Sequence, residues 1–235
     1  MDPSEGPPIV TLHVWGVRAT AIPLAFLHMA TDRAALRRTP GLRFAKLLGT
    51  GDGRTFTMRD ADLGHWGVLG TWAAPAAAEQ FEDAPLVRSW NRLAHERLRV
   101  RLRPIASRGT WAGATPFGDP HPAPYDGPVA AVTRARIAPR HWVRFWRSVP
   151  PVSADLHRHP GSGLRLALGI GEAPVGLQGT FSLWESGAAL TEFAHRRGPH
   201  AAVVRRTAEV GWYTEELFAR LAVESVDGTF GGRTP

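Results

Sequence analysis

Alternation of apolar and polar positions predicts four strands in the first 108 residues, with helical periodicity between them. The strands are expected at Ile9–Val17 and at residues 42–48, 65–72 and 98–105. Helical patterns cover residues 22–38, where Pro40 and Gly41 end the helix, and residues 76–96. The order β-α-β-β-α-β is that of a ferredoxin-like unit.

The same order recurs after residue 128. Strands are expected at Val129–Ile137 and at residues 164–170, 175–184 and 219–226, and helical segments at residues 140–147 and 188–206. The stretch between the two series is rich in Pro and Gly, which is typical of a linker. We therefore expect an N-terminal ferredoxin-like half at residues 1–108, a linker at 109–128 and a C-terminal ferredoxin-like half at 129–235.

Short sequence matches support an internal duplication. The run that begins Leu42-Arg43-Phe44-Ala45 matches Leu164-Arg165-Leu166-Ala167, residues 69–72 match 178–181, and Ala84-Pro85-Leu86 matches Gly198-Pro199-His200. Helices can cover only one face of each half's sheet, so the two open faces can pack together. The expected fold is α+β, with two tandem ferredoxin-like halves packed as a dimeric α/β barrel within one chain. Two loosely associated ferredoxin-like domains are the alternative.

Composition narrows the classes of function. The chain has no cysteine, which excludes disulfides, iron–sulfur clusters and thiolate-ligated haem. The net charge of +7 comes almost entirely from arginine, and these arginines are dispersed, so we expect no nucleic-acid partner. No signal peptide and no membrane-spanning stretch are recognisable, so a soluble, cytoplasmic protein is expected.

His200 is the histidine with the most informative surroundings. Gly198 can end one helix and Pro199 can begin the next, which places His200 in a first helical turn. The positive end of the helix dipole disfavours the imidazolium there and keeps a ring nitrogen free for iron. An ordinary histidine near a helix cap is the competing interpretation, and spacing alone favours it.

Other candidates are weaker. His157 and His159 form a bare H-x-H beside Pro160, and His195 lies five residues from His200 and points elsewhere. The nine tryptophans are explained by core packing, although a cavity lined by them would also suit a large apolar ligand. Polar groups that could orient such a ligand are Arg147, Arg165 and Gln178.

Several segments together resemble the spheroidene monooxygenase family, which contains carotenoid ketolases. The likeness covers most of the chain. The segments that carry it are residues 145–150, 166–174, 180–184, 198–201 and 211–217, with 46–51 and 109–117 in the first half. The resemblance implies a haem-dependent monooxygenase that takes electrons from a ferredoxin and inserts oxygen into an apolar substrate.

The resemblance also implies roles for individual residues. Related haem proteins, including the aldoxime dehydratases, hold iron through a histidine on a helix of the C-terminal half, which makes His200 the expected ligand of haem b. Phe181, Phe193 and Val204 are expected to wall the haem, and Arg165 and Gln178 are candidate catalytic polar groups opposite the iron ligand.

Two other functions stay open. A haem-dependent dehydratase would bind its substrate to iron through nitrogen and consume no oxygen. A non-enzymatic ligand-binding module is the third reading, because ferredoxin-like pairs often bind without catalysis. A peripheral contact with a membrane and a homodimer stay open as further partners.

Overall fold

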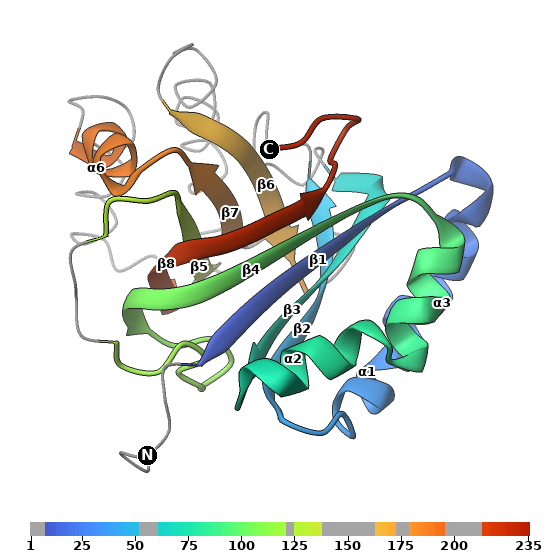
Figure 1. Ribbon diagram of the computed structural model, residues 1–235. Helices are drawn as coiled ribbons and strands as arrows, with labels where there is room; N and C mark the ends of the chain where they lie inside the picture. The colour runs from blue at the N-terminus through green and yellow to red at the C-terminus, as the bar shows by residue number, and fades with distance from the viewer. Residues whose placement is uncertain (1–7, 52–60, 121–124, 138–162, 173–178, 196–212) are drawn as a thin grey trace.

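A computed structural model of the chain describes residues 8–51, 61–120, 125–137, 163–172, 179–195 and 213–235. Eight strands close into a barrel in the order β1-β3-β2-β6-β7-β5-β8-β4 (Figure 1). Each pairing is antiparallel, and the strands are β1 (Ile9–Val17), β2 (Leu42–Gly51), β3 (Ala61–Trp72), β4 (Ala94–Gly109), β5 (Val129–Ile137), β6 (Leu164–Gly171), β7 (Gly179–Trp184) and β8 (Tyr213–Gly228). The expectation of a mixed α+β fold is confirmed.

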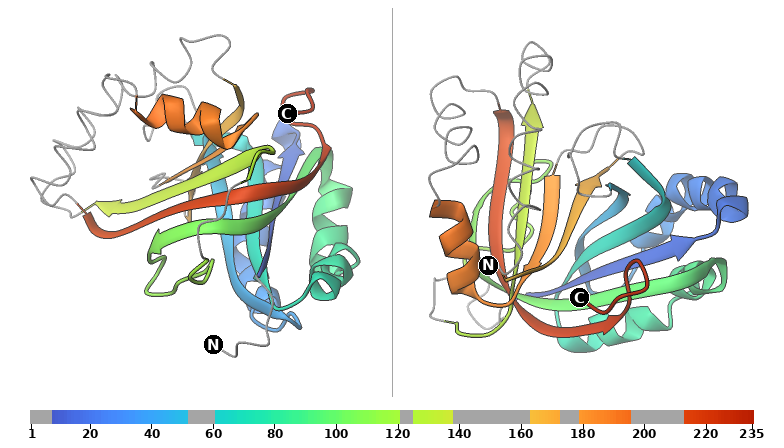
Figure 2. Two further views of the ribbon diagram at one scale, coloured as in Figure 1. Left: turned by 60° about the vertical axis from the view of Figure 1, so that its left-hand side comes forward. Right: turned by 90° about the horizontal axis from the view of Figure 1, so that it is seen from above.

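The helices lie outside the barrel. The short turn η1 (Ala19–Ala21) leads into α1 (Ile22–Leu36), which lies with α2 (Pro75–Glu82) and α3 (Pro85–Leu93) on the side of β1–β4. On the far side, α6 (Gly187–His195) lies beside β7 (Figure 2). Within the described residues no helix is long and apolar enough to cross a membrane.

The prediction of a single helix at residues 76–96 is wrong. Ala84 is extended, as the residue before a proline prefers, and Pro85 begins a second helix. The pattern that continues from Ala94 belongs to β4, where Leu98 is buried and Arg97 is exposed. Two helices form in place of one long helix because Pro85 has no backbone N–H with which to continue α2, and a new helix begins at this proline.

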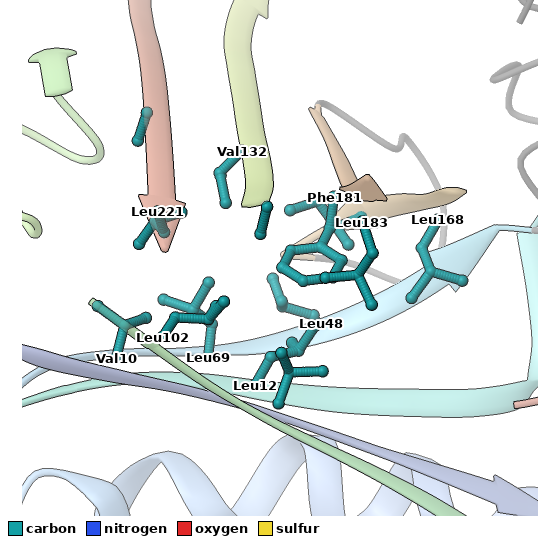
Figure 3. Close-up of a cluster of buried hydrophobic side chains, with 14 of the residues drawn as sticks. Val10, Leu12, Leu48, Leu69, Leu102, Val132, Leu168, Phe181, Leu183 and Leu221 are labelled. Carbon is teal, nitrogen blue, oxygen red and sulfur yellow. The ribbon is translucent and has the colours of Figure 1, made fainter. Parts of the chain in front are cut away.

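Side chains fill the barrel interior. Apolar residues from all eight strands meet there, and Figure 3 shows Leu12, Leu48 and Leu69 facing Val132, Phe181 and Leu183. Trp111 and Phe117, from the segment predicted as a linker, are also buried in this core. Because the interior is packed, a large ligand has to bind elsewhere.

A second apolar cluster fills the space between β1–β3 and the helices that cover them. Its large members are aromatic: Trp15, Trp66, Trp72, Trp90 and Phe81. On the other side of the barrel, the described residues form a cluster in which Val129, Trp184 and Ala222 are buried and Leu190 and Phe193 are partly buried against them.

Strand register shows how the two series of elements correspond. Trp72 pairs with Ile9 and Leu42, and Trp184 pairs in the same way with Val129 and Leu164. A register shift follows Leu42 and recurs after Leu164. The match of Leu42 with Leu164 is therefore confirmed. The match of residues 69–72 with 178–181 is wrong by three positions, because a short Gly-Thr-aromatic run is too little to fix register.

Candidate functional site

The outer faces of β1 and β5 carry side chains of very different size. Counted from the equivalent pairs of Trp72 and Trp184, His13 and Trp15 of β1 correspond to Thr133 and Ala135 of β5. In the first series the imidazole of His13 stacks on the Trp15 indole at 5.5 Å between ring centroids. The second series presents a hydroxyl and a methyl group at the same places, so the strands themselves leave more room there.

The surroundings of this small-residue face combine apolar walls with hydroxyl groups. The hydroxyls of Thr133 and Thr180 lie 2.5 Å apart across β5 and β7. Trp184 donates through Nε1 to Ser182 Oγ at 2.8 Å, and its ring centroid lies 5.2 Å from that of Phe193. We define the outer face of the second series as Ala131, Thr133, Ala135, Thr180, Ser182, Trp184 and Phe193. Its chemistry suits a flat, largely apolar group.

The predicted wall residues are not brought together. Phe181 is fully buried and points into the barrel interior, whereas Phe193 lies on α6, outside the barrel, against Trp184. The two rings therefore lie on opposite faces of β7, and one ligand cannot contact both. Arg165 is exposed on β6. Gln178, His200, Val204 and Arg147 lie outside the described residues.

A buried ionic network, which the sequence analysis missed, closes one end of the barrel interior. Arg134 is 3% exposed and reaches Glu172 Oε1 at 3.0 Å and the Glu215 carboxylate. Lys46 Nζ binds the other oxygen of Glu172 at 2.7 Å, and Trp111 donates through Nε1 to Glu172 at 2.6 Å. Three of these groups come from β2, β5 and β8, so the network links distant segments.

Both carboxylates of the network are held in the ionised form. Burial alone would raise the pKa of Glu215, but hydrogen bonds from the Gly113 amide and the Arg134 guanidinium lower it to about 2. The pKa of Glu172 is lowered as well, because the bonds from Lys46 and Trp111 outweigh burial. Neither group is suited to exchange protons at neutral pH, and the network is structural.

A second polar cluster lies at the other end of the β4–β8 pair. His65 Nδ1 lies 2.5 Å from Asp62 Oδ2, and His65 Nε2 lies 3.3 Å from Glu96 Oε2. Burial opposes protonation of His65, but its two carboxylate partners outweigh burial and raise its pKa. The described part of the chain contains no group of three or more His, Asp or Glu side chains arranged to hold a metal ion.

Comparison with known proteins gives relatives along nearly the whole chain. Spheroidene monooxygenase of Rhodobacter capsulatus is 34% identical over an alignment of 241 positions, which covers 97% of this chain and 95% of that protein. Spheroidene monooxygenase of Rubrivivax gelatinosus is 40% identical over 195 residues, which cover 83% and 73%. No family model matches the chain.

Solved structures with a similar fold include two of aldoxime dehydratase. One has a TM-score of 0.60 and covers 94% of this chain and 83% of that chain. The other, a complex with butyraldoxime, has a TM-score of 0.62 and covers 94% and 80%. Both are 12% identical to this chain, so the likeness concerns the fold alone.

Proposed function

We propose, from the premise that this chain belongs to the spheroidene monooxygenase family, that it is a haem-dependent monooxygenase acting on an apolar, carotenoid-like substrate. The chain is an oxygenase, and the identity of 34% across 95% of a relative's length is the observation that carries the proposal. The electrons would come from a ferredoxin or a similar carrier, as the resemblance to this family implies.

The proposed place for haem b is the outer face of the second series. The barrel interior is packed with side chains, and the equivalent face of the first series is filled by Trp15, Trp66 and Trp90. In β5 the residues that correspond to His13 and Trp15 are Thr133 and Ala135, which leave space for a planar group beside the strand. The small and hydroxyl-bearing side chains of β5 support this proposal, and the proposed iron ligand, His200, lies outside the described residues.

In this proposal the chain's own residues bind and orient. His200 would hold the iron, Val204 and Phe193 would wall the ring, and Arg165 and Gln178 would orient the substrate. Phe181 would support the site from inside the barrel, because it packs behind β7. Haem, when bound, supplies the iron at which dioxygen is activated for transfer to the substrate.

We also propose that the two series of elements are tandem ferredoxin-like halves that form a dimeric α/β barrel within one chain. The recurring register of Trp72 and Trp184 supports this reading. So does the matching position of Gly41 and Gly163, which both have positive φ and both lie close to an alanine of the following helix.

An absorption spectrum of protein produced with haem supply tests the proposal. We expect a Soret band that shifts on reduction and on addition of carbon monoxide, and that is lost in His200→Ala. His195→Ala is the matched control, because it removes an imidazole five positions away and should leave the band intact. A colourless protein would overturn the haem assignment, and a band unaffected by His200→Ala would overturn His200 as the iron ligand.

Turnover separates oxygenase from dehydratase chemistry. With a ferredoxin, its reductase and a carotenoid, we expect oxygen consumption that depends on the substrate. Conversion of an aldoxime without oxygen or added electrons would instead support the alternative function, a haem-dependent dehydratase like the aldoxime dehydratase with which this chain shares its fold.

A further inference from the structure

Helix α1 is apolar both on the face that it packs on the sheet and on the face that it turns to solvent. Ala25, Met29 and Leu36 are buried, whereas Leu24 is 52% exposed and Leu27 is 56% exposed. The other exposed apolar positions of this helix are Pro23, Phe26, Ala30, Ala34 and Ala35. A surface helix ordinarily carries polar side chains on its outer face, whereas α1 presents an apolar face that no described residue covers at Leu24 and Leu27.

The charged side chains that α1 and the residues just after it turn to solvent are all positive. Its single carboxylate, Asp32, is turned inward and binds Trp90 Nε1 at 2.9 Å and His28 Nδ1 at 3.0 Å. Arg33, Arg37 and Arg38 are exposed at its C-terminal end. The helix therefore combines a wide apolar face with cations at one end and no exposed carboxylate.

A polar cavity of about 440 Å³ adjoins this end of the helix. It lies between α1 and β2 and is lined by Arg33, Arg37, Arg43 and Lys46, with Glu172 as its carboxylate. That carboxylate is already bound by Lys46 at 2.7 Å and by Arg134 at 3.0 Å. The cavity therefore has an excess of positive charge where an anionic group could approach.

We propose that α1 is the surface by which this protein lies on an anionic phospholipid membrane, with Leu24 and Leu27 among the acyl chains and the arginines at its C-terminal end on lipid phosphates. A helix with an apolar face bordered by arginines binds the interface in this way. A second copy of the chain packed along α1 would bring more arginines and no exposed carboxylate from that helix, so an anionic partner is favoured. Figures 1 and 2 show α1 at the periphery, on the side opposite α6, where a flat surface can reach it. The inference does not rest on the proposed function.

Sedimentation with vesicles tests it. We expect the protein to bind vesicles of phosphatidylcholine with 30% phosphatidylglycerol and to bind pure phosphatidylcholine weakly. The double variant Arg33→Gln/Arg37→Gln should lower the partition coefficient about 25-fold, at about fivefold for each arginine near the surface. Leu24→Gln/Leu27→Gln should lower it on the order of tenfold, since both side chains leave the acyl region.

The matched control is Arg88→Gln/Arg92→Gln, which removes the same charge from exposed positions of the neighbouring helix α3 and should leave binding within about twofold. Because Leu24 and Leu27 are exposed, their variants should fold normally, which circular dichroism checks. No binding to the anionic vesicles would overturn the proposal, and so would binding that the leucine changes leave intact. Conversion of a dimer to a monomer by those changes, with vesicle binding unaltered, would assign the face to self-association instead.

Discussion

Glu96 and Glu215 hold equivalent loops at the two ends of the β4–β8 pair. Glu96 accepts hydrogen bonds from the Thr229 hydroxyl and from the amides of Gly231 and Gly232, at 2.6–3.0 Å. Glu215 accepts from the Thr110 hydroxyl at 3.1 Å and from the Gly113 amide at 2.7 Å.

In each loop the threonine follows a glycine that no other residue can replace without strain. Gly109 has φ +87°, and a Cβ there would lie 2.1 Å from the carbonyl oxygen of Glu216. Gly228 has φ +92°, and its Cβ would lie 2.1 Å from that of Arg97. The loop after each long strand thus docks on the glutamate that begins the neighbouring strand, and the two series hold each other closed.

Replacing Glu215 should destabilise the protein more than replacing an exposed neighbour. Glu215→Gln leaves the buried Arg134 with Glu172 as its remaining carboxylate and weakens the bonds to the 109–113 loop. We expect the free energy of unfolding to fall by about 3 kcal/mol, as for other broken buried ion pairs. Urea titration measures it, with the exposed Glu216→Gln as control at about 0.5 kcal/mol or less. Equal effects of the two changes would contradict a structural role for the network.

Acid should weaken the fold in two stages. Burial and the nearby Arg99 lower the pKa of His13 from its usual 6.5 to about 3, so only the unfolded chain takes up this proton as the pH falls below 6.5. Below pH 4.5 Glu215 also takes up a proton in the unfolded chain, whereas in the fold its pKa is about 2. The free energy of unfolding should therefore decrease as the pH falls from 6.5, and more steeply below 4.5.

Variants assign the two stages. His13→Gln should flatten the decrease between pH 6.5 and 4.5, because it removes the imidazole that takes up a proton in the unfolded chain but stays neutral in the fold. His95→Gln, which replaces an imidazole at an exposed position of β4, is the matched control. A slope that both variants share with the unaltered protein would show that His13 is protonated in the folded state.

Ala135→Trp tests where the ligand binds. The substitution places on β5 the indole that β1 carries at Trp15, so it should occupy the proposed haem position while the barrel, whose interior it does not enter, stays folded. We expect haem affinity to fall on the order of tenfold or more, because overpacking a pocket costs roughly 1–3 kcal/mol. Titration with haem, followed at the Soret band, measures it.

The matched control is Ala188→Trp, which adds the same side chain at an exposed position of α6. Unchanged haem binding by Ala135→Trp, in a protein that unfolds at the same urea concentration as the original, would place the ligand elsewhere.

Two strands were predictable from sequence with the bounds that the structure gives them. Ile9–Val17 and Val129–Ile137 are observed with the predicted bounds. In β4 the apolar side chains Leu98, Val100 and Leu102 face the barrel interior, and Arg101 on the other face binds Glu79 and Glu224. Where one face is apolar and the other polar, the pattern alone identifies which side is buried.

The ionic network could not be predicted in the same way. In a closed barrel covered by helices both faces of a strand are buried, so the alternation around Arg134 does not say which face is the interior. Its partners Lys46, Glu172 and Glu215 are far apart in the sequence and meet only through strand order.

The barrel is joined very unevenly along its two seams. Between β4 and β8 the strands pair from Leu98–Gly228 to Gly109–Leu217, whereas the described residues of β2 and β6 pair only at Gly49–Gly171, Thr50–Ile170 and Gly51–Gly169. Few backbone hydrogen bonds and glycine-rich strands make the short seam the cheaper one to open. Amide hydrogen exchange should therefore begin along the short β2–β6 seam. The long β4–β8 seam should retain its amide protons longest.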